Sequence, residues 1–111
     1  MKTFVKVRVE FEGVHRYPKA PKEVAHLRND HRHTFIVTAQ VQVRDSDREI
    51  EFYMLRDYLK STLQDGHLDY LSCEMINEQV MEKLQWQYGV NREYIVETSE
   101  DGIRSAVTYS H

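Results

Sequence analysis

The stretch HRHTFIVTAQVQVR, residues 31–44, indicates the fold, because apolar side chains alternate with polar ones along most of its length. The alternating apolar residues are Phe35, Val37, Ala39, Val41 and Val43. This pattern predicts a strand over about His33 to Arg44 with one buried face. The same alternation, continued backwards, reaches His33 and His31, so both imidazoles leave the strand on its apolar face.

A second strand is predicted near the N-terminus, over about Thr3 to Phe11. Its apolar face carries Val5, Val7, Val9 and Phe11. The same parity extends through Gly13 to His15, so two strands bring His15, His31 and His33 to one wall. Three neutral imidazoles with one open position form the usual ligand set of a catalytic zinc ion. The alternative is that these histidines end their strands without binding a metal.

The remaining chain alternates between breaks and amphipathic segments. Pro18 and Pro21 exclude regular structure from the centre of a loop over Gly13 to Asp30. A helix is predicted over Ile50 to Gln64, with a stripe formed by Phe52, Leu55, Leu59 and Leu63, and Asp65-Gly66 ends it.

A second helix is predicted over Glu74 to Tyr88, with Ser72 as the N-cap and Gly89 beyond its end. A β-hairpin then follows, formed by Tyr94 to Thr98, a turn at Glu100-Asp101-Gly102, and Ile103 to Tyr109.

The resulting order, β-β-α-α-β-β, predicts an α+β fold in a single domain over residues 1–111. We expect an antiparallel four-stranded sheet with two helices on one face. Such a small sheet leaves its edges exposed, and pairing between subunits would cover them. The sequence therefore predicts a homo-oligomer.

Composition limits the classes of partner and compartment. The net charge of −3 argues against non-specific nucleic-acid binding. No apolar run approaches the length that crosses a membrane, and the N-terminus alternates too early for a signal peptide. The single cysteine, Cys73, suits a reducing compartment, so we expect a cytoplasmic protein without a membrane partner.

Several short motifs occur in a characteristic order. They are Phe11-Glu12-Gly13-Val14-His15, His31-Arg32-His33, Glu51-Phe52 with Leu55, Leu68-Asp69-Tyr70, Glu78 and Glu97-Thr98. In order and spacing, this set resembles the 6-pyruvoyltetrahydropterin synthase and 6-carboxytetrahydropterin synthase family, whose members have the tunnelling fold. The resemblance extends over most of the chain, from Phe11 to Thr98.

The resemblance implies that His15, His31 and His33 bind Zn²⁺ and that the ligand is a pterin such as 7,8-dihydroneopterin triphosphate. It also implies that Glu97, with Thr98 beside it, binds the pterin, whose paired N–H donors match a carboxylate. Family sites lie between subunits of a hexamer built from two trimers, so a trimer or a hexamer is expected.

Two proton-transfer positions depart from the family pattern. Leu27 stands where the family has a catalytic cysteine, and Tyr70 stands where it has a histidine, whereas Asp69 is retained. Asp69 and Tyr70 are therefore the remaining catalytic candidates. His26 could replace the missing base after a one-residue shift, or it is an ordinary loop histidine.

A basic loop could hold a triphosphate, or it could be a solvated surface. Its residues are Arg16, Lys19, Lys22, Arg28 and Arg32. Two principal functions remain open at this point. The chain is either a zinc-dependent lyase with an altered proton relay or a non-catalytic binder of a pterin or guanine-like ligand. A structural subunit without a ligand is a third reading.

Overall fold

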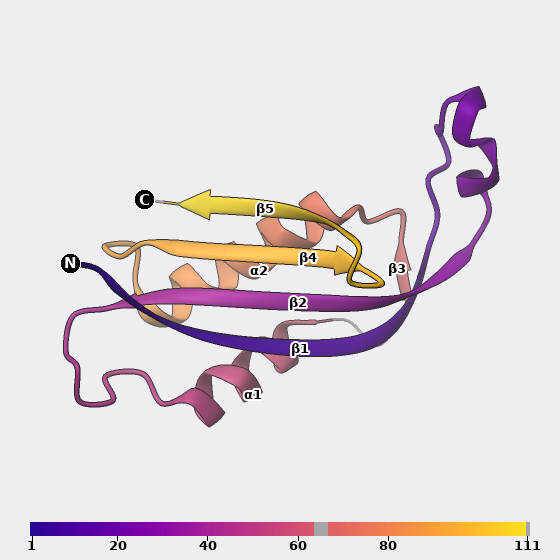
Figure 1. Ribbon diagram of the computed structural model, residues 1–111. Helices are drawn as coiled ribbons and strands as arrows, with labels where there is room; N and C mark the ends of the chain where they lie inside the picture. The colour runs from indigo at the N-terminus through magenta and orange to yellow at the C-terminus, as the bar shows by residue number, and fades with distance from the viewer. Residues whose placement is uncertain (64–66, 111) are drawn as a thin grey trace.

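The predicted α+β architecture is present in the computed structural model, which describes residues 1–63 and 67–110 (Figure 1). Five strands form one sheet in the order β3-β1-β2-β4-β5. Their bounds are β1 (Thr3–His15), β2 (His31–Val43), β3 (His67–Asp69), β4 (Tyr94–Glu100) and β5 (Arg104–Ser110). The expected four strands pair antiparallel, but β3 adds a fifth that runs parallel to β1. With only three residues, β3 is too short to show an alternating pattern.

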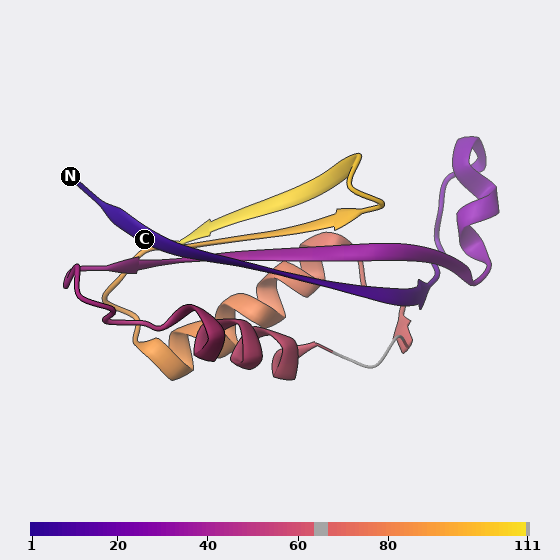
Figure 2. The same cartoon turned by 60° about the horizontal axis from the view of Figure 1, so that its bottom comes forward.

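Both main helices, α1 (Phe52–Thr62) and α2 (Cys73–Tyr88), cover the same face of the sheet, as predicted (Figure 2). Helix α1 packs on β1, and α2 packs on β4 and β5. The core between the layers includes Phe35, Val37, Leu55, Leu59, Val80, Leu84, Tyr94 and Val96. Each such side chain stabilises the fold by about 1.5–3 kcal/mol on burial.

Strands β1 and β2 form a long antiparallel pair that continues to the register pair His15↔His31. Strand β1 therefore extends beyond the predicted end at Phe11, because Gly13 pairs with His33 without interrupting the ladder. Along both strands the burial alternates with the predicted parity. This parity places the three histidines on the helix-covered face.

The helix ends agree with the sequence signals for α2. The Ser72 hydroxyl accepts a hydrogen bond from the Met75 amide, and Gly89 ends the helix at a φ of 101°. Helix α1 is shorter than predicted, and Phe52 in its first turn is exposed rather than part of the buried stripe. The predicted end at Asp65-Gly66 lies outside the described residues.

The loop between β1 and β2 projects beyond the end of the sheet (Figure 1). It contains a 3₁₀ segment, η1 (Lys22–Arg28), broken by non-helical dihedral angles at Val24. The predicted loop over Gly13 to Asp30 therefore contains a short 3₁₀ segment after its two prolines. Pro21 precedes the segment with a φ of −66°, and proline is tolerated at such a start because the first amides lack helical acceptors.

None of the helices in the described residues is both long and apolar enough to cross a membrane.

Candidate metal centre

Three imidazoles meet at the end of the β1–β2 pair, where the sequence predicted them. His15 lies opposite His31 in the ladder, and His33 lies opposite Gly13 on the same face. The ring centroids are 4.5 Å apart for His15 and His31 and 5.0 Å apart for His31 and His33. One nitrogen from each ring lies within 4.8 Å of the others. This separation suits three ligands of a single metal ion.

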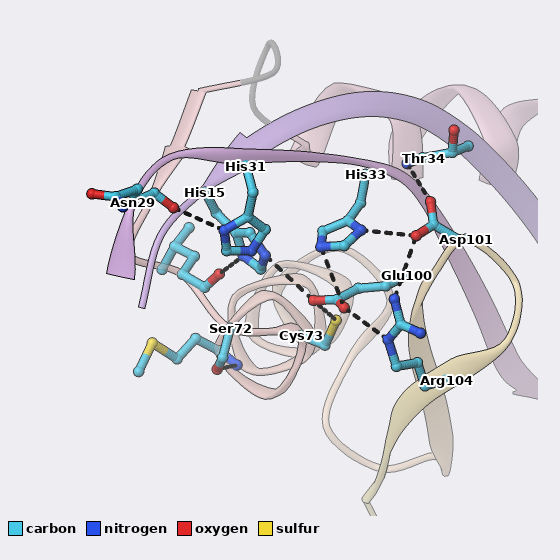
Figure 3. A network of polar contacts seen from close by, with 12 residues as sticks. His15, Asn29, His31, His33, Thr34, Ser72, Cys73, Glu100, Asp101 and Arg104 are labelled. Atoms are coloured by element: carbon cyan, nitrogen blue, oxygen red, sulfur yellow. Dashed lines mark hydrogen bonds and ion pairs between the residues drawn. The ribbon is translucent and has the colours of Figure 1, made fainter. Parts of the chain in front are cut away.

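Each imidazole is oriented by a hydrogen bond from its Nδ1 atom (Figure 3). The Nδ1 of His15 donates to the Leu71 carbonyl at 2.8 Å, and that of His31 donates to the Asn29 carbonyl at 2.9 Å. The Nδ1 of His33 donates to a carboxylate oxygen of Asp101 at 2.8 Å.

These acceptors fix the tautomer of the three rings. A neutral imidazole carries one N–H, so an Nδ1 donor leaves a lone pair on Nε2. An outer acceptor on the second ring nitrogen is the usual companion of a metal-binding histidine. The Nε2 atom of His15 is buried and has no hydrogen-bond partner among the described residues. The donor set therefore fits a zinc ion, which accepts imidazole nitrogen readily.

Phe35 forms an apolar wall beside the histidines. Its ring lies edge-on to His15 and His33, with centroids 5.2 and 5.8 Å away. Gly13 makes this packing possible, because a Cβ atom at that position would lie 2.7 Å from the Phe35 ring. An apolar surround restricts water and strengthens electrostatic interactions at the site.

Asp101 is a site residue that sequence reasoning assigned only to a turn. It adopts a φ of 59° and accepts both the His33 Nδ1 proton and the Thr34 amide, the latter at 3.0 Å. The hydrogen bond from His33, followed by that from the Thr34 amide, lowers the pKa of Asp101. Its role depends on how the β4–β5 turn lies against β2, so the local sequence carries no signal for it.

A pocket of about 420 Å³ opens beside His15 and His31. Leu27 and Tyr70, which the resemblance placed at proton-transfer positions, both line it. His26 is exposed and does not line this pocket, so the structure places it as a loop residue.

Asp69 lies at the rim of this region rather than in the pocket lining. It is exposed, adopts a φ of 54°, and pairs with Arg16 at 3.3 Å. Arg16 also lies 3.6 Å from Asp30, and the Arg28 Nε donates to the Ala20 carbonyl. These two members of the basic loop therefore have partners within the chain.

Cys73 also lines the pocket, at the first turn of α2. Burial, followed by the charge of Glu100, raises the pKa of the Cys73 thiol to about 12. The protein thus holds a protonated thiol in the pocket wall rather than a thiolate nucleophile.

Glu97 and Thr98, the predicted pterin-binding residues, lie apart from the histidines. Glu97 faces the side of the sheet away from the helices, where it accepts a hydrogen bond from the Ser105 hydroxyl at 2.7 Å. The Thr98 hydroxyl points into the core and donates to the Asn77 side chain at 2.6 Å. Within one chain, the carboxylate of Glu97 and the three imidazoles are thus on opposite faces of the sheet.

The fold is the tunnelling fold seen in solved 6-pyruvoyltetrahydropterin synthases. The structure is similar to that of 6-pyruvoyl tetrahydropterin synthase from Plasmodium falciparum, with a TM-score of 0.71 and 14% identity, over 99% of this chain and 98% of that one. The Plasmodium vivax enzyme matches with a TM-score of 0.62 and 12% identity, over 98% and 99% of the two chains.

A mutant of the P. vivax enzyme at a catalytic residue also matches, with a TM-score of 0.60 and 14% identity, over 98% and 99% of the chains. No protein-family model matches this sequence, and no curated protein matches it significantly. At these identities the similarity establishes the fold, and the chemistry has to be argued from the residues.

Proposed function

We propose that this chain is a zinc-binding protein of the 6-pyruvoyltetrahydropterin synthase type that binds a pterin such as 7,8-dihydroneopterin triphosphate. The observation that supports this most is the histidine arrangement. Three rings with hydrogen-bonded Nδ1 atoms direct their Nε2 lone pairs to one place, in the fold of a pterin synthase.

His15, His31 and His33 would hold the ion. When bound, zinc would attract the oxygens of a ligand side chain and acidify neighbouring C–H and O–H groups. The chain itself contributes orientation, through Leu71, Asn29 and Asp101.

The pocket wall favours binding over synthase chemistry. Leu27 has no group that can accept a proton, and Tyr70 offers a phenol where the resemblance implies an imidazole. Asp69 remains a candidate proton acceptor at the rim. A lyase with this altered relay is the second candidate, because zinc can assist such chemistry without the missing groups.

Glu97 is the proposed anchor of the pterin ring. Because it faces away from the histidines of its own chain, we propose that it acts with the metal site of a neighbouring subunit in a homotrimer or hexamer. Thr98 would contribute to the site indirectly, since its hydrogen bond to Asn77 holds this part of β4 against α2. The free thiol of Cys73 suits the cytoplasm as the compartment.

Metal content tests the first half of this proposal. Protein purified without added zinc is expected to contain close to one zinc per chain, and His31→Ala is expected to lose most of it. The control Glu82→Gln changes an exposed carboxylate on α2 and is expected to retain the metal. Full zinc occupancy in the His31→Ala variant would contradict the assigned ligand set.

Pterin binding tests the second half. Titration of zinc-loaded protein with 7,8-dihydroneopterin triphosphate, followed by ligand fluorescence, is expected to show saturable binding. Glu97→Gln is expected to weaken it, because an amide cannot accept two N–H donors as a carboxylate does. Glu82→Gln again serves as the control. Absence of binding to the zinc-loaded protein would exclude this ligand class and leave only the fold.

A further inference from the structure

Glu100 ends β4 beside the three histidines, although the sequence analysis assigned it only to a turn. In the register of the sheet it lies opposite Phe35, so its side chain points to the same face as His33. The side chain is 21% exposed, and Figure 3 shows its carboxylate between the imidazoles and the start of α2. A partly buried carboxylate requires positive or hydrogen-donating partners.

The carboxylate faces the ring nitrogens that lack hydrogen atoms. Its Oε1 lies 3.3 Å from the Nε2 of His15, and its Oε2 lies 3.6 Å from the Nε2 of His33. Since both rings donate from Nδ1, each neutral ring presents a lone pair to an anionic oxygen. Such an arrangement of acceptors is repulsive unless a cation lies among them.

The distances from Glu100 to His15 and to His33 match those between neighbouring ligands around one ion. Zinc binds nitrogen and carboxylate oxygen at about 2.0–2.2 Å, and a tetrahedron of that size separates its ligand atoms by about 3.3–3.6 Å. The two separations between Glu100 and the histidines are close to this edge length. One divalent ion would satisfy the carboxylate and all three imidazoles together.

Glu100 is itself held in place from the side away from the histidines. The Arg104 Nε donates to its Oε2 at 3.3 Å, and the same guanidinium lies 3.5 Å from Asp101. The Cys73 thiol lies 3.9 Å from Oε1 as a weak donor. Outer partners of this kind orient a ligating carboxylate as Asp101 orients His33.

We propose that Glu100 is the fourth protein ligand of the metal, so that three imidazoles and one carboxylate close its coordination shell. This inference rests on the proposed metal site and goes further, because a closed shell is typical of a structural ion, whereas a catalytic ion keeps an open position. The ion would join β1, β2 and the end of β4. A pterin oxygen could reach the ion only by displacing Glu100.

Cobalt(II) in place of zinc reports the coordination shell directly. The visible spectrum of the cobalt-loaded wild-type protein is expected to be that of a four-coordinate ion and to remain unchanged when azide is added. Glu100→Ala is expected to acquire an azide-dependent spectrum, because it exposes one coordination position. A wild-type spectrum that responds to azide as strongly as that of Glu100→Ala would overturn the proposal.

The affinity for the metal ion, measured on a variant with an isosteric substitution at Glu100, provides a second readout. Glu100→Gln is expected to weaken cobalt or zinc binding by at least about 10–100-fold, the range already found when an outer-shell partner is lost. Glu82→Gln, with the same loss of one charge, is expected to bind as the wild type does. Near-ultraviolet circular dichroism checks that both variants are folded.

The outcomes separate this inference from the function on which it rests. Unchanged affinity in folded Glu100→Gln would show that the ion is held by the histidines alone. Failure of the wild-type protein to bind cobalt or zinc would instead remove the metal site itself, and with it both proposals.

Discussion

In each of the three site histidines, the hydrogen bond made by one ring nitrogen determines what the other ring nitrogen can bind. Each Nδ1 is engaged by an acceptor from a different part of the chain: the Leu71 carbonyl, the Asn29 carbonyl or the Asp101 carboxylate. The Nε2 atoms are thereby left as lone pairs directed at one another. This geometry supports the proposed metal site over the alternative that the three histidines only end their strands.

Leu27 and Tyr70, which line the pocket, allow a test of the proton-transfer groups. Introducing the groups that the resemblance implies, with Leu27→Cys and Tyr70→His, is expected to raise turnover of 7,8-dihydroneopterin triphosphate, because a positioned acid or base contributes about 10²–10⁴-fold. Product formation by the zinc-loaded double variant is compared with that of the wild type. The single variants serve as controls, and high activity in the unmodified protein would show that other groups transfer the protons.

At the scale of elements, the β1–β2 pair determines where the histidines lie, and Gly13 allows the pair to pack closely. The side of this glycine on which other residues carry a Cβ atom receives the Phe35 ring and approaches the Leu68 side chain. The contact between Gly13 and Phe35 therefore belongs both to the wall of the histidine site and to the hydrophobic core.

Gly13→Ala tests this contact. The added Cβ would lie 2.7 Å from two Phe35 ring atoms, so the ring or the strand must shift. Such overpacking typically destabilises a protein by about 1–3 kcal/mol. Urea unfolding measures the loss of free energy of unfolding. Ala106→Gly on β5 serves as a comparison for a small substitution in a strand. Gly102→Ala would be a poor control, because Gly102 has a positive φ. Unchanged stability in Gly13→Ala would show that the contact has room to relax.

A second element-scale prediction concerns Glu49, which joins the end of β2 to the segment before β4. The Asp45 and Arg44 amides donate to its Oε1, and Arg92 pairs with its Oε2 at 2.7 Å. The hydrogen bonds from Asp45 and Arg44, then that from Arg92, lower the pKa of Glu49 from 4.5 to about 2.

Because the folded-state pKa is depressed, the ionised Glu49 stabilises the protein above about pH 4.5, and this contribution is lost as the pH falls towards 2. Glu49→Gln is therefore expected to lower the thermal midpoint at pH 7, with a difference from wild type that narrows below pH 4.5. Thermal unfolding across this pH range measures the narrowing. A difference that is constant with pH would show that charge is not its cause.

At the scale of the whole molecule, the sheet ends in two different edges. The short β3 forms one edge, and β5 forms the other with Val107 and Tyr109 exposed along it. The face away from the helices is open to a partner, and it carries Glu97 (Figure 2). Exposed edges favour association through the sheet.

The expected outcome in solution is a trimer or a hexamer. Light scattering coupled to gel filtration at micromolar concentration gives the mass of the particle in comparison with the 13.3 kDa chain. Val107→Glu, which places a charge on exposed β5, is expected to shift the mass towards that of the monomer. A wild-type monomer at these concentrations would contradict the proposed intersubunit role of Glu97.

The sequence alone determined the features that depend on local periodicity. Alternation along β1 and β2 placed His15, His31 and His33 on one face, and amphipathic spacing located α1 and α2, because side-chain direction follows from the geometry of each element. The order of these elements was enough to predict the α+β fold.

Only the tertiary structure decided what surrounds the histidines. Glu100 and Asp101 reach them because β4 pairs with β2 in one particular register, and β3 joins β1 across a long separation in sequence. The placement of Glu97 on the opposite face follows from the same register. Such contacts depend on which strands pair and at what offset, and no local pattern in these residues records that choice.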